Sequence, residues 1–588
     1  MTEASRACTP DDRGGATEGP KLIHEAGYRY ERRRPERTVL YRVVQDNLET
    51  FYAAVAEGFV TASLPDFVRN EFERFLDCGL LCKGAALLEC ESEGCCGIQV
   101  VALSCKGRAW CPSCSGRRMA QTAANVVERV LPEDVPLRQW VVTFPYELRG
   151  KLGFDSKLLS TVCGVVVDSI LAFYERRMRD VLGPLSRFTV AEASPLQDPD
   201  PEDGDPEEDD ARASNSRQET RHPKARRRKL QSGTVTAVQR VSSDFRLNPH
   251  LHVLALDGVF VEQPDGSTPQ FHQLPHLKSS EVADLVTTIR IRVLGLLVRR
   301  GVLEDLDEQL VLLPDDRAES EPVLAQLTGA AASGLPPAGP EHRQRSPLRL
   351  ARTPGASISG ALCAADMGFT LHAATIAPRD HPEAKEALVR YILRPPLAQE
   401  RLSRSADGKV RLGLKRAFSD GTVAVELDPL SFLCRLAAAV PGPGFHTVRY
   451  GGILSAASKW RPLVVPEASQ PESPSVASAP PGSDTGEPPA AGNAPCKARS
   501  TWRPWRELLK RSFELDIQCS QCGGPLKLKA FLVRPQSLRR LLETLGEPTH
   551  APQRAPPRPP PYFTDRPTRR HQRHDEGSDQ TVLFDEPA

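Results

Sequence analysis

The spacing of apolar residues divides the chain into helical and extended blocks. Apolar residues recur every three or four positions, as in amphipathic helices, over 38–76, 117–131, 156–182, 279–302, 381–394, 430–440 and 536–545. Two-residue alternation or short apolar runs predict strands over 138–148, 233–241, 248–258, 368–376, 409–427 (a hairpin) and 445–454. The strands at 233–241 and 248–258 can pair as antiparallel neighbours. The mixture predicts an α+β fold of several domains.

Segments rich in proline, glycine and charge separate these blocks. The chain has 588 residues, too many for one core, so about two to four domains are expected. Residues 193–229 carry an acidic run, then a basic run, and almost no large apolar residues, so we expect a disordered insertion. A second insertion is expected over 314–360 and a linker over 466–500. Both ends, 1–37 and 548–588, are expected to be disordered.

The composition indicates a cytoplasmic protein. The 76 lysines and arginines balance the 75 acidic residues, so net charge points to no particular partner. We expect no membrane contact, because no apolar run approaches the roughly 20 residues of a membrane span. The N-terminal residues 1–15 contain no apolar signal core. In the cytoplasm, the 15 cysteines are expected to be thiols or metal ligands rather than disulfides.

Cysteines are concentrated in one short region, as Cys78, Cys82, Cys90, Cys95, Cys96, Cys105, Cys111 and Cys114. Cys111 and Cys114 form a tight knuckle, and Cys90 with Cys95 supplies an opposite pair, as a tetrahedral thiolate zinc site requires. Cys96 could take the place of Cys95, and Cys105 could replace one of the four. Cys78 or Cys82 could join a second site. We expect a structural zinc, whose apparent binding energy of about 10–16 kcal/mol would make folding of the module depend on it.

Two further features accompany this cluster. Cys519 and Cys522 form another closely spaced pair, which predicts a small knuckle-like module over 501–547. Arg117 and Arg118 follow the first knuckle at the start of a helix. Arginines there often contact nucleic-acid phosphate, although a solvated helix end explains them as well.

His250 and His252 flank one apolar residue in a predicted strand. Side chains alternate faces along a strand, so both histidines point the same way, about 7 Å apart. Two neutral imidazoles so placed can hold a divalent metal. The alternative is that they are simply two polar residues on the solvent-exposed face of an edge strand. Gln239, on the neighbouring predicted strand, could supply a third, oxygen ligand.

Tyr391 is the residue that we pair with the two histidines. A tyrosine near a divalent ion is a nucleophile arrangement for phosphodiester cleavage, because the metal polarises the phosphate and the phenolate attacks phosphorus. Arg390 and Arg394 flank it and could hold neighbouring phosphates. Taken alone, Tyr391 could equally be an amphipathic helix residue at the edge of the core.

Eight motifs occur in an order that resembles the rolling-circle transposases of the insertion sequence ninety-one family. They are SCKGRAWCPSCSGRRMAQTAANVVERVLP, RQWVVTFPYELR, VTAVQRVSSDFRLNPHLHVLALDGVF, GFTLHA, RYILRPPLAQERL, LKRAFSDGT, FHTVRYGGIL and CSQCGGPLKL. That family belongs to the His-hydrophobic-His (HUH) endonucleases and carries an N-terminal transposase zinc-binding domain. The resemblance covers most of residues 70–465 and the C-terminal knuckle.

The resemblance implies a zinc-binding DNA-recognition domain over 38–135 and an HUH-type antiparallel-sheet catalytic domain over 136–465. It implies single-stranded DNA transposition through a 5′ phosphotyrosine on Tyr391, with magnesium or manganese on His250, His252 and, less directly, Gln239. The partner would be DNA at the element's ends and target, with the protein acting on the bacterial nucleoid.

The sequence departs from the founding members of the family in one respect. They carry two tyrosines four residues apart, whereas this chain has Ala387 at the partner position and resembles a single-tyrosine branch. Tyr391 could then be reused, or Tyr450 or a second subunit of a homodimer could complete strand transfer. A replication initiator or relaxase with the same chemistry, a non-catalytic zinc DNA-binding regulator, and a purely structural zinc protein are the alternatives.

Overall fold

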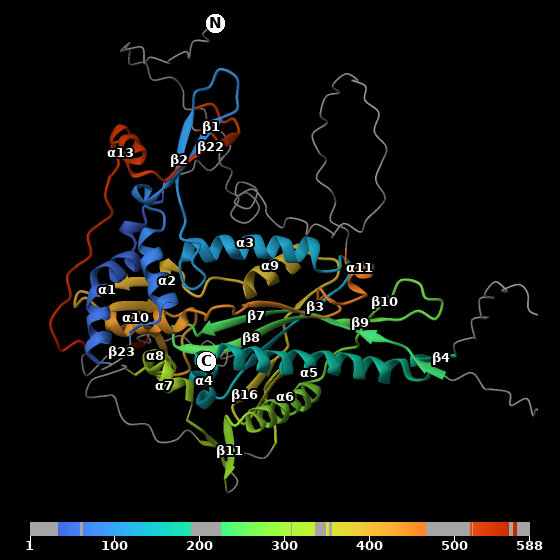
Figure 1. Cartoon of the computed structure of the whole chain (residues 1–588). Helices are drawn as coiled ribbons and strands as arrows, with labels where there is room; N and C mark the ends of the chain where they lie inside the picture. The colour runs from blue at the N-terminus through green and yellow to red at the C-terminus, as the bar shows by residue number, and fades with distance from the viewer. Residues whose placement is uncertain are drawn as a thin grey trace, which may run out of the picture.

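A computed structural model of the chain combines helices with antiparallel sheets, which confirms the predicted α+β fold (Figure 1). Every strand pair among the described residues is antiparallel. The structure describes residues 33–58, 63–189, 225–306, 309–314, 316–335, 349–351, 355–465, 518–519, 521–563 and 568–572. Most of the predicted insertion at 193–229, the linker at 466–500 and most of the N-terminal segment lie outside these residues.

The largest sheet forms the centre of the molecule. Its strands run in the order β14 (Ser357–Gly360), β15 (Cys363–Asp366), β16 (Phe369–His372), β3 (Leu137–Thr143), β8 (Leu247–Leu256), β7 (Gly233–Val241) and β21 (Val448–Gly452), and β17 (Ile376–Ala377) also pairs with β3. The predicted antiparallel pair is therefore β7 and β8. In this register His250 lies opposite Thr143 on β3 and Gln239 on β7.

Helices cover both faces of this sheet (Figure 1). Helices α5 (Ser156–Leu182) and α6 (Ser279–Arg299) pack below it, where Leu251 and Val253 of β8 join their fully buried core. Helices α3 (Pro112–Arg129) and α9 (Pro382–Ile392) lie on the opposite face. Because alternate side chains of β8 point to opposite faces, a buried Leu251 turns His250 and His252 toward α3 and α9.

Helix α5 shows a property that the sequence analysis missed. It is long and apolar enough, by length and composition, to cross a membrane. Its buried residues, among them Val162, Val166 and Ile170, pack against the central sheet in the same core cluster as α6. Burying such side chains contributes about 1.5–3 kcal/mol each, so α5 is explained as a core helix.

The N-terminal helices α1 (Val39–Gly58) and α2 (Asp66–Asp77) form a second body beside the sheet. Trp110 is fully buried against Phe72 and Phe75 of α2, with ring centroids 5.1 and 4.7 Å away. Helices α10 (Pro429–Ala439), α4 (Tyr146–Phe154) and α8 (Pro322–Ser333) complete this part of the core. The prediction of a structureless insertion over 314–360 is thus wrong for α8, because Leu327 and its neighbours are buried.

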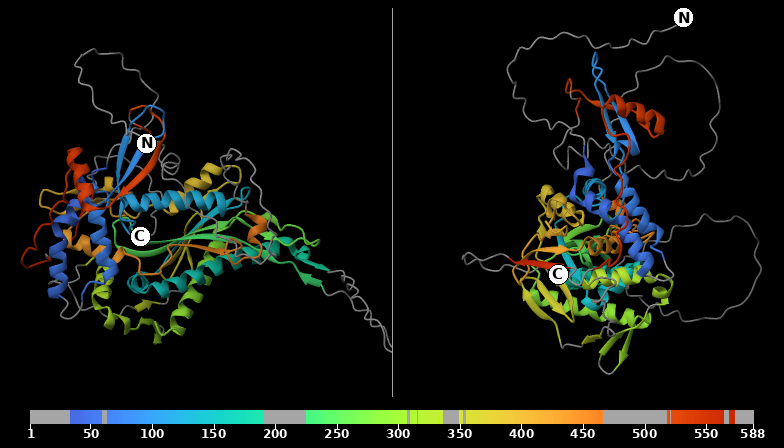
Figure 2. Two further views of the ribbon diagram at one scale, coloured as in Figure 1. Left: turned by 45° about the horizontal axis from the view of Figure 1, so that its top comes forward. Right: turned by 90° about the vertical axis from the view of Figure 1, so that its left-hand side faces the viewer.

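A small sheet stands out from the body. Figure 2 shows its strands, blue and red, rising beside the red helix. Its order is β2 (Ile98–Ala102), β1 (Ala85–Cys90) and β22 (Leu526–Leu532), and helix α13 (Pro535–Thr544) covers one face. The C-terminal knuckle predicted as a separate module therefore shares a sheet with the N-terminal cysteine region, because β22 pairs with β1.

The described residues after α13 run back along the N-terminal helices (Figure 1). Arg554 bonds Glu49 at 2.9 Å and also Glu73, and Tyr562 donates to Glu57 at 2.6 Å. Residues 548–563 are therefore held against the body, unlike the predicted disordered tail. The last described strand, β23 (Thr568–Gln572), extends the sheet of β18 (Leu402–Arg404), β19 (Val410–Gly413) and β20 (Thr422–Leu427).

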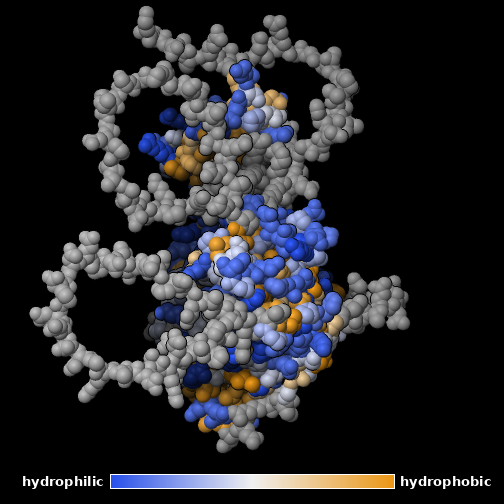
Figure 3. Space-filling view, turned by 90° about the vertical axis from the view of Figure 1, so that its right-hand side faces the viewer, coloured by the Kyte–Doolittle hydropathy of each residue, from blue (hydrophilic) through white to orange (hydrophobic). Residues whose placement is uncertain are grey.

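Short elements at the edges complete the fold. They are η1 (Pro35–Arg37), η2 (Leu81–Lys83), η3 (Gly183–Ser186), η4 (Gln399–Arg401), β4 (Arg187–Thr189), β5 (Ala225–Arg227), β6 (Leu230–Gln231), β9 (Gly258–Val261), β10 (Gln270–Gln273), β11 (Leu303–Leu306), β12 (Gln309–Leu312), β13 (Arg349–Ala351), α7 (Asp316–Ser320) and α11 (Arg461–Val464). The face of the molecule in Figure 3 is mostly hydrophilic, with scattered apolar patches.

Candidate active site and metal centres

Strand β8 presents His250 and His252 side by side on the face toward α9. Their ring centroids are 5.1 Å apart. The Nδ1 atom of His250 lies 2.7 Å from the carbonyl oxygen of Asn248, to which it can donate. That hydrogen bond fixes the tautomer in which Nε2 carries the lone pair, the form that a metal ligand requires.

His252 is held in the interior, with 3 % of its surface exposed. The side-chain amide of Gln139 contacts its Nδ1 at 2.7 Å, while its Nε2 is buried without a hydrogen-bond partner. Burial lowers the pKa of His252 well below its ordinary value, and the charges of His250, Arg394 and Lys415 act in the same direction. A neutral imidazole with a buried, unpartnered nitrogen fits a divalent metal.

Tyr391 lies beside this pair, near the end of helix α9. Its ring centroid is 6.0 Å from that of His252, in an edge-on arrangement. The guanidinium of Arg394 lies over the tyrosine ring, 4.3 Å from its centroid. The structure thus brings together the two histidines and the tyrosine that the sequence analysis paired, although they lie on separate elements.

The predicted third ligand, Gln239, has a second contact. Its amide nitrogen donates to the carbonyl oxygen of Ile392 at 3.0 Å, which ties the helix of Tyr391 to the sheet. Its amide oxygen is the atom that could reach a metal. Asn248, which the sequence analysis overlooked, shares a face with His250 and His252, and its Oδ1 is buried without a partner. The alternation Asn-x-His-x-His was the signal that could have identified it.

A cleft of about 240 Å³ opens beside these residues. His250, Tyr391 and Asn248 line it together with four cationic side chains, Arg394, Arg401, Lys415 and Arg416. Asp244 is the one carboxylate among its described lining residues, and Arg246 neutralises it at 2.5 Å. The cleft therefore favours an anionic ligand. Arg390, by contrast, is half-buried and lies near Glu386.

A second pocket of about 130 Å³ adjoins this cleft. Both share Gln239, Val241, Arg394, Pro395 and Pro396 in their walls. The far wall of the second pocket comes from helix α3 and the loop before it, with Arg108, Ser115, Arg118, Met119 and Thr122. Arg118 is therefore part of this lining, whereas Arg117 is half-buried outside it.

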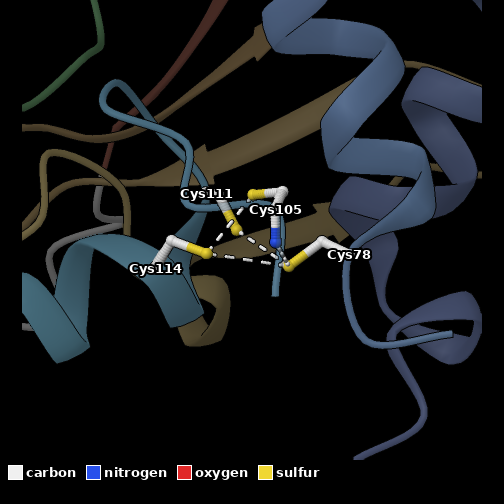
Figure 4. A group of neighbouring side chains, drawn as sticks. All are labelled: Cys78, Cys105, Cys111 and Cys114. Atoms are coloured by element: carbon white, nitrogen blue, oxygen red, sulfur yellow. Dashed lines mark hydrogen bonds between the residues drawn. The ribbon is translucent and has the colours of Figure 1, made fainter. Parts of the chain in front are cut away.

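Four cysteines meet at the start of helix α3, as Figure 4 shows: Cys78, Cys105, Cys111 and Cys114. Their sulfurs all lie within 4.8 Å of one another. Hydrogen bonds with Cys105 and Cys111 lower the pKa of Cys78 to about 7, and contacts with the same two thiols lower that of Cys114. The contacts with Cys105, Cys114 and Cys78 raise the pKa of Cys111. A dication at the centre would let all four ionise, which fits structural zinc.

The predicted zinc ligands are divided between two groups. Cys111 and Cys114 belong to the group in Figure 4, whereas Cys90 and Cys95 lie with Cys519 and Cys522. The prediction that Cys90, Cys95, Cys111 and Cys114 share one ion is therefore not what the structure shows. Strand pairing causes the separation, because β1 and β2 carry Cys90 and Cys95 out with the small projecting sheet.

Comparison with known families agrees with this arrangement. Residues 45–144 match the family model described as "Transposase zinc-binding domain", and residues 233–461 match the model described as "Putative transposase". No match was found among curated proteins or solved structures. The first match contains the cysteine group of Figure 4, and the second contains His250, His252 and Tyr391. Both families imply DNA binding and DNA cleavage. The chain belongs to the transposases of the insertion sequence ninety-one type.

Proposed function

We propose that this transposase cuts and rejoins single-stranded DNA through a covalent bond between Tyr391 and a 5′ phosphate, in rolling-circle transposition. The observation that supports this most directly is that His250 and Tyr391 line one basic cleft, with His252 buried directly beside both of them. The tyrosine alone, or the histidine pair alone, would support this function only weakly.

Magnesium or manganese would be held by His250 and His252, with an oxygen from Asn248 or Gln239, and would polarise the scissile phosphate. The remaining steps belong to the chain. The Tyr391 hydroxyl gives up its proton to solvent, its oxygen forms a bond to phosphorus, and the bond from phosphorus to the 3′ oxygen breaks. The departing 3′ oxygen takes up a proton and becomes a free hydroxyl. Strand transfer is the reverse reaction with a different 3′ hydroxyl, which releases Tyr391.

The cationic lining of the cleft would hold the phosphates on either side of the scissile bond. Arg394 already lies over the Tyr391 ring, so one guanidinium faces both the nucleophile and the adjoining pocket. Charge-assisted hydrogen bonds from guanidinium groups to phosphate are among the stronger polar contacts in proteins. Positioning of the phosphate against Tyr391 would be their main contribution to rate.

The two adjoining pockets suggest the path of the DNA strand. A strand that leaves the cleft past Pro395 and Pro396 would enter the pocket beside Arg108 and Arg118 of the zinc-binding domain. Apolar side chains such as Met119 and Val448 are part of its lining, as is common where single-stranded bases bind. A pocket of about 130 Å³ is too small for a duplex, so it would receive part of an unpaired strand. Recognition by the zinc-binding domain would thereby be coupled to cleavage.

A single tyrosine would perform both steps. Tyr391 lines the cleft, whereas Tyr450 of β21 lies in the partly buried layer between the sheet and α3, next to Arg461. We therefore propose that Tyr391 is reused after each transfer. A homodimer that supplies a second Tyr391 is compatible with the same chemistry.

A nicking assay on single-stranded DNA with the element's terminus tests the proposal. With magnesium or manganese, the unmodified protein should cut the strand, and Tyr391→Phe and His250→Ala should not. Tyr450→Phe is the matched control and should retain cutting. If every protein bound the DNA and none cut it with either metal, the non-catalytic regulator would be the better account.

A further inference from the structure

The second cysteine group joins two ends of the chain. Cys90 and Cys95 come from the β1–β2 hairpin, and Cys519 and Cys522 precede β22. Cys90 Sγ lies 3.4 Å from Cys522 Sγ, and Cys95 Sγ lies 3.7 Å from Cys519 Sγ. A tetrahedral zinc with Zn–S bonds near 2.3 Å separates its sulfurs by about 3.8 Å. The spacing is therefore that of a tetrathiolate metal site.

The backbone around these sulfurs is arranged to receive negative charge. The amides of Ser92, Gly97 and Gly524 donate to the sulfurs of Cys90, Cys95 and Cys522 respectively, each at 3.4 Å. The same kind of contact occurs in the first group, where the Gly107 amide donates to Cys105 at 3.2 Å. Hydrogen bonds that favour the charged form are expected for metal-bound thiolates.

Two glycines allow the two halves to approach. A Cβ at Gly97 would lie 2.3 Å from Cys519 Sγ, and a Cβ at Gly524 would lie 1.9 Å from Ser92 Oγ. Neither distance is sterically possible unless the Cys519 or Ser92 side chain, or the backbone beside it, moves. The N-terminal hairpin and the C-terminal segment are therefore fitted to each other at this point.

We propose that Cys90, Cys95, Cys519 and Cys522 bind a second structural zinc, which clasps the C-terminal segment onto the N-terminal zinc-binding domain. Each segment supplies two thiolates, so neither can complete the site alone. The family match at 45–144 includes only the first pair. The second pair, Cys519 and Cys522, thus completes the zinc-binding domain from a position 375 residues beyond the end of that match.

The packing around the site explains why a metal is needed there. Docking of the C-terminal segment pairs β22 with β1 along its length. Among the described residues, the buried core beneath them consists of Leu81, Ala85, Leu538 and Leu542, with a few partly buried apolar side chains around it. The ion pairs Lys529–Glu89 and Lys527–Glu91 are solvent-exposed and contribute little. So small a core rarely holds two segments together without a metal or a disulfide.

The two zinc sites should differ in how readily they lose the ion. In the first group three of the four cysteines are buried, whereas in the second Cys522 is exposed and Cys95 is half-exposed. Chelator should therefore reach the second zinc sooner. Loss of that ion would free β22 from β1, while the contacts of residues 548–563 with the N-terminal helices, the first zinc site and the catalytic cleft stay intact.

Zinc content of the full chain, measured by native mass spectrometry, tests this proposal directly. The unmodified protein should carry two zinc ions, and the double variant Cys519→Ser/Cys522→Ser should carry one. Cys96→Ser is the matched control, because Cys96 is an exposed neighbour outside both groups, and it should keep two. One zinc in the unmodified protein, or two in the double variant, would overturn the proposal.

A conservative variant covers the case in which the double variant does not fold. Cys522→His keeps four ligands, so it should still bind two metal ions per chain. When cobalt replaces zinc in both sites, the thiolate-to-cobalt charge-transfer absorption of this variant should be about one eighth lower than that of the unmodified protein, because seven thiolates remain of eight. If absorption were unchanged, Cys522 would not be a ligand, and the second site would have to be abandoned.

Discussion

Gln139 holds His252 in place through a 2.7 Å contact between its side-chain amide and the Nδ1 atom of the imidazole. Both side chains are buried, each with 3 % of its surface exposed. They come from the neighbouring central strands β3 and β8, so the sheet itself fixes their distance. A half-turn of the amide would present its oxygen to Nδ1–H and leave the lone pair on Nε2, the orphaned nitrogen that faces the proposed metal.

Gln139→Leu should weaken binding of manganese by about 10–100-fold, because it removes the hydrogen bond that orients the His252 ligand, and losing such a bond usually costs that much affinity. Gln139→Glu should retain or tighten binding, because a carboxylate accepts the Nδ1–H bond more strongly. Titration with manganese, followed by calorimetry, gives the affinities without any DNA. Equal affinities in the two variants would show that Gln139 only fills space.

His252 should make stability depend on pH in a defined direction. Its pKa in the folded protein is well below the unfolded value of about 6.5. The unfolded chain therefore binds the proton more readily, so stability is full above about pH 6.5 and falls as the pH drops below it, by at most ~1.4 kcal/mol per pH unit. Without added magnesium or manganese, denaturant unfolding of His252→Gln should show a shallower decline between pH 6.5 and 5. An identical decline would mean that His252 is not buried as a neutral imidazole.

Loss of the first zinc should unfold the N-terminal domain. Cys111→Ser removes one of the four sulfurs in Figure 4, at the position that follows the buried Trp110. The variant should therefore lose most of the apparent zinc-binding energy of about 10–16 kcal/mol that stabilises the folded domain. Trp110 packs on Phe72 and Phe75, so its near-ultraviolet circular dichroism reports this core. The signal should be lost in Cys111→Ser and kept in Cys96→Ser. A retained signal in both variants would limit the zinc to a local role.

The basic side of the cleft should determine how binding of single-stranded DNA responds to salt. Lys415 and Arg416 are exposed on its wall. Replacement of both by alanine should reduce the slope of log affinity against log salt by about 1.4, because each lost phosphate contact lowers the slope by roughly 0.7. Arg404→Ala is the control, because Arg404 pairs with Asp46 at 2.8 Å and lines neither pocket. An equal slope in both variants would place the strand elsewhere.

Much of this molecule is predictable because its strongest signals are local. The alternation around His250 and the three- and four-residue spacing of α5, α6 and α9 predicted those elements near their observed bounds. The pairing of β7 with β8 followed from their proximity in the chain. The predicted strand over 138–148 ended early, because α4 begins at Tyr146 after Pro145.

The remaining features depend on contacts between distant residues, which periodicity does not encode. Cys90 could not be assigned to Cys522 from spacing, because strand addition by β22 creates that contact. Gln139 was missed for the same reason, since only the sheet register places it beside His252. The apolar, alanine-rich composition of α8 was masked in the sequence by the proline- and glycine-rich residues around it.

The most direct test of the central claim is to map the covalent bond between protein and DNA. The full chain would be mixed with labelled single-stranded DNA that carries the element's terminus, with manganese or magnesium, then denatured, digested and analysed by mass spectrometry. We predict a 5′ phosphate on Tyr391, absent when the divalent metal is omitted or when Tyr391 is replaced by phenylalanine. An adduct on Tyr450 or another residue, or cleavage with no adduct at all, would contradict the assignment of Tyr391 as the nucleophile.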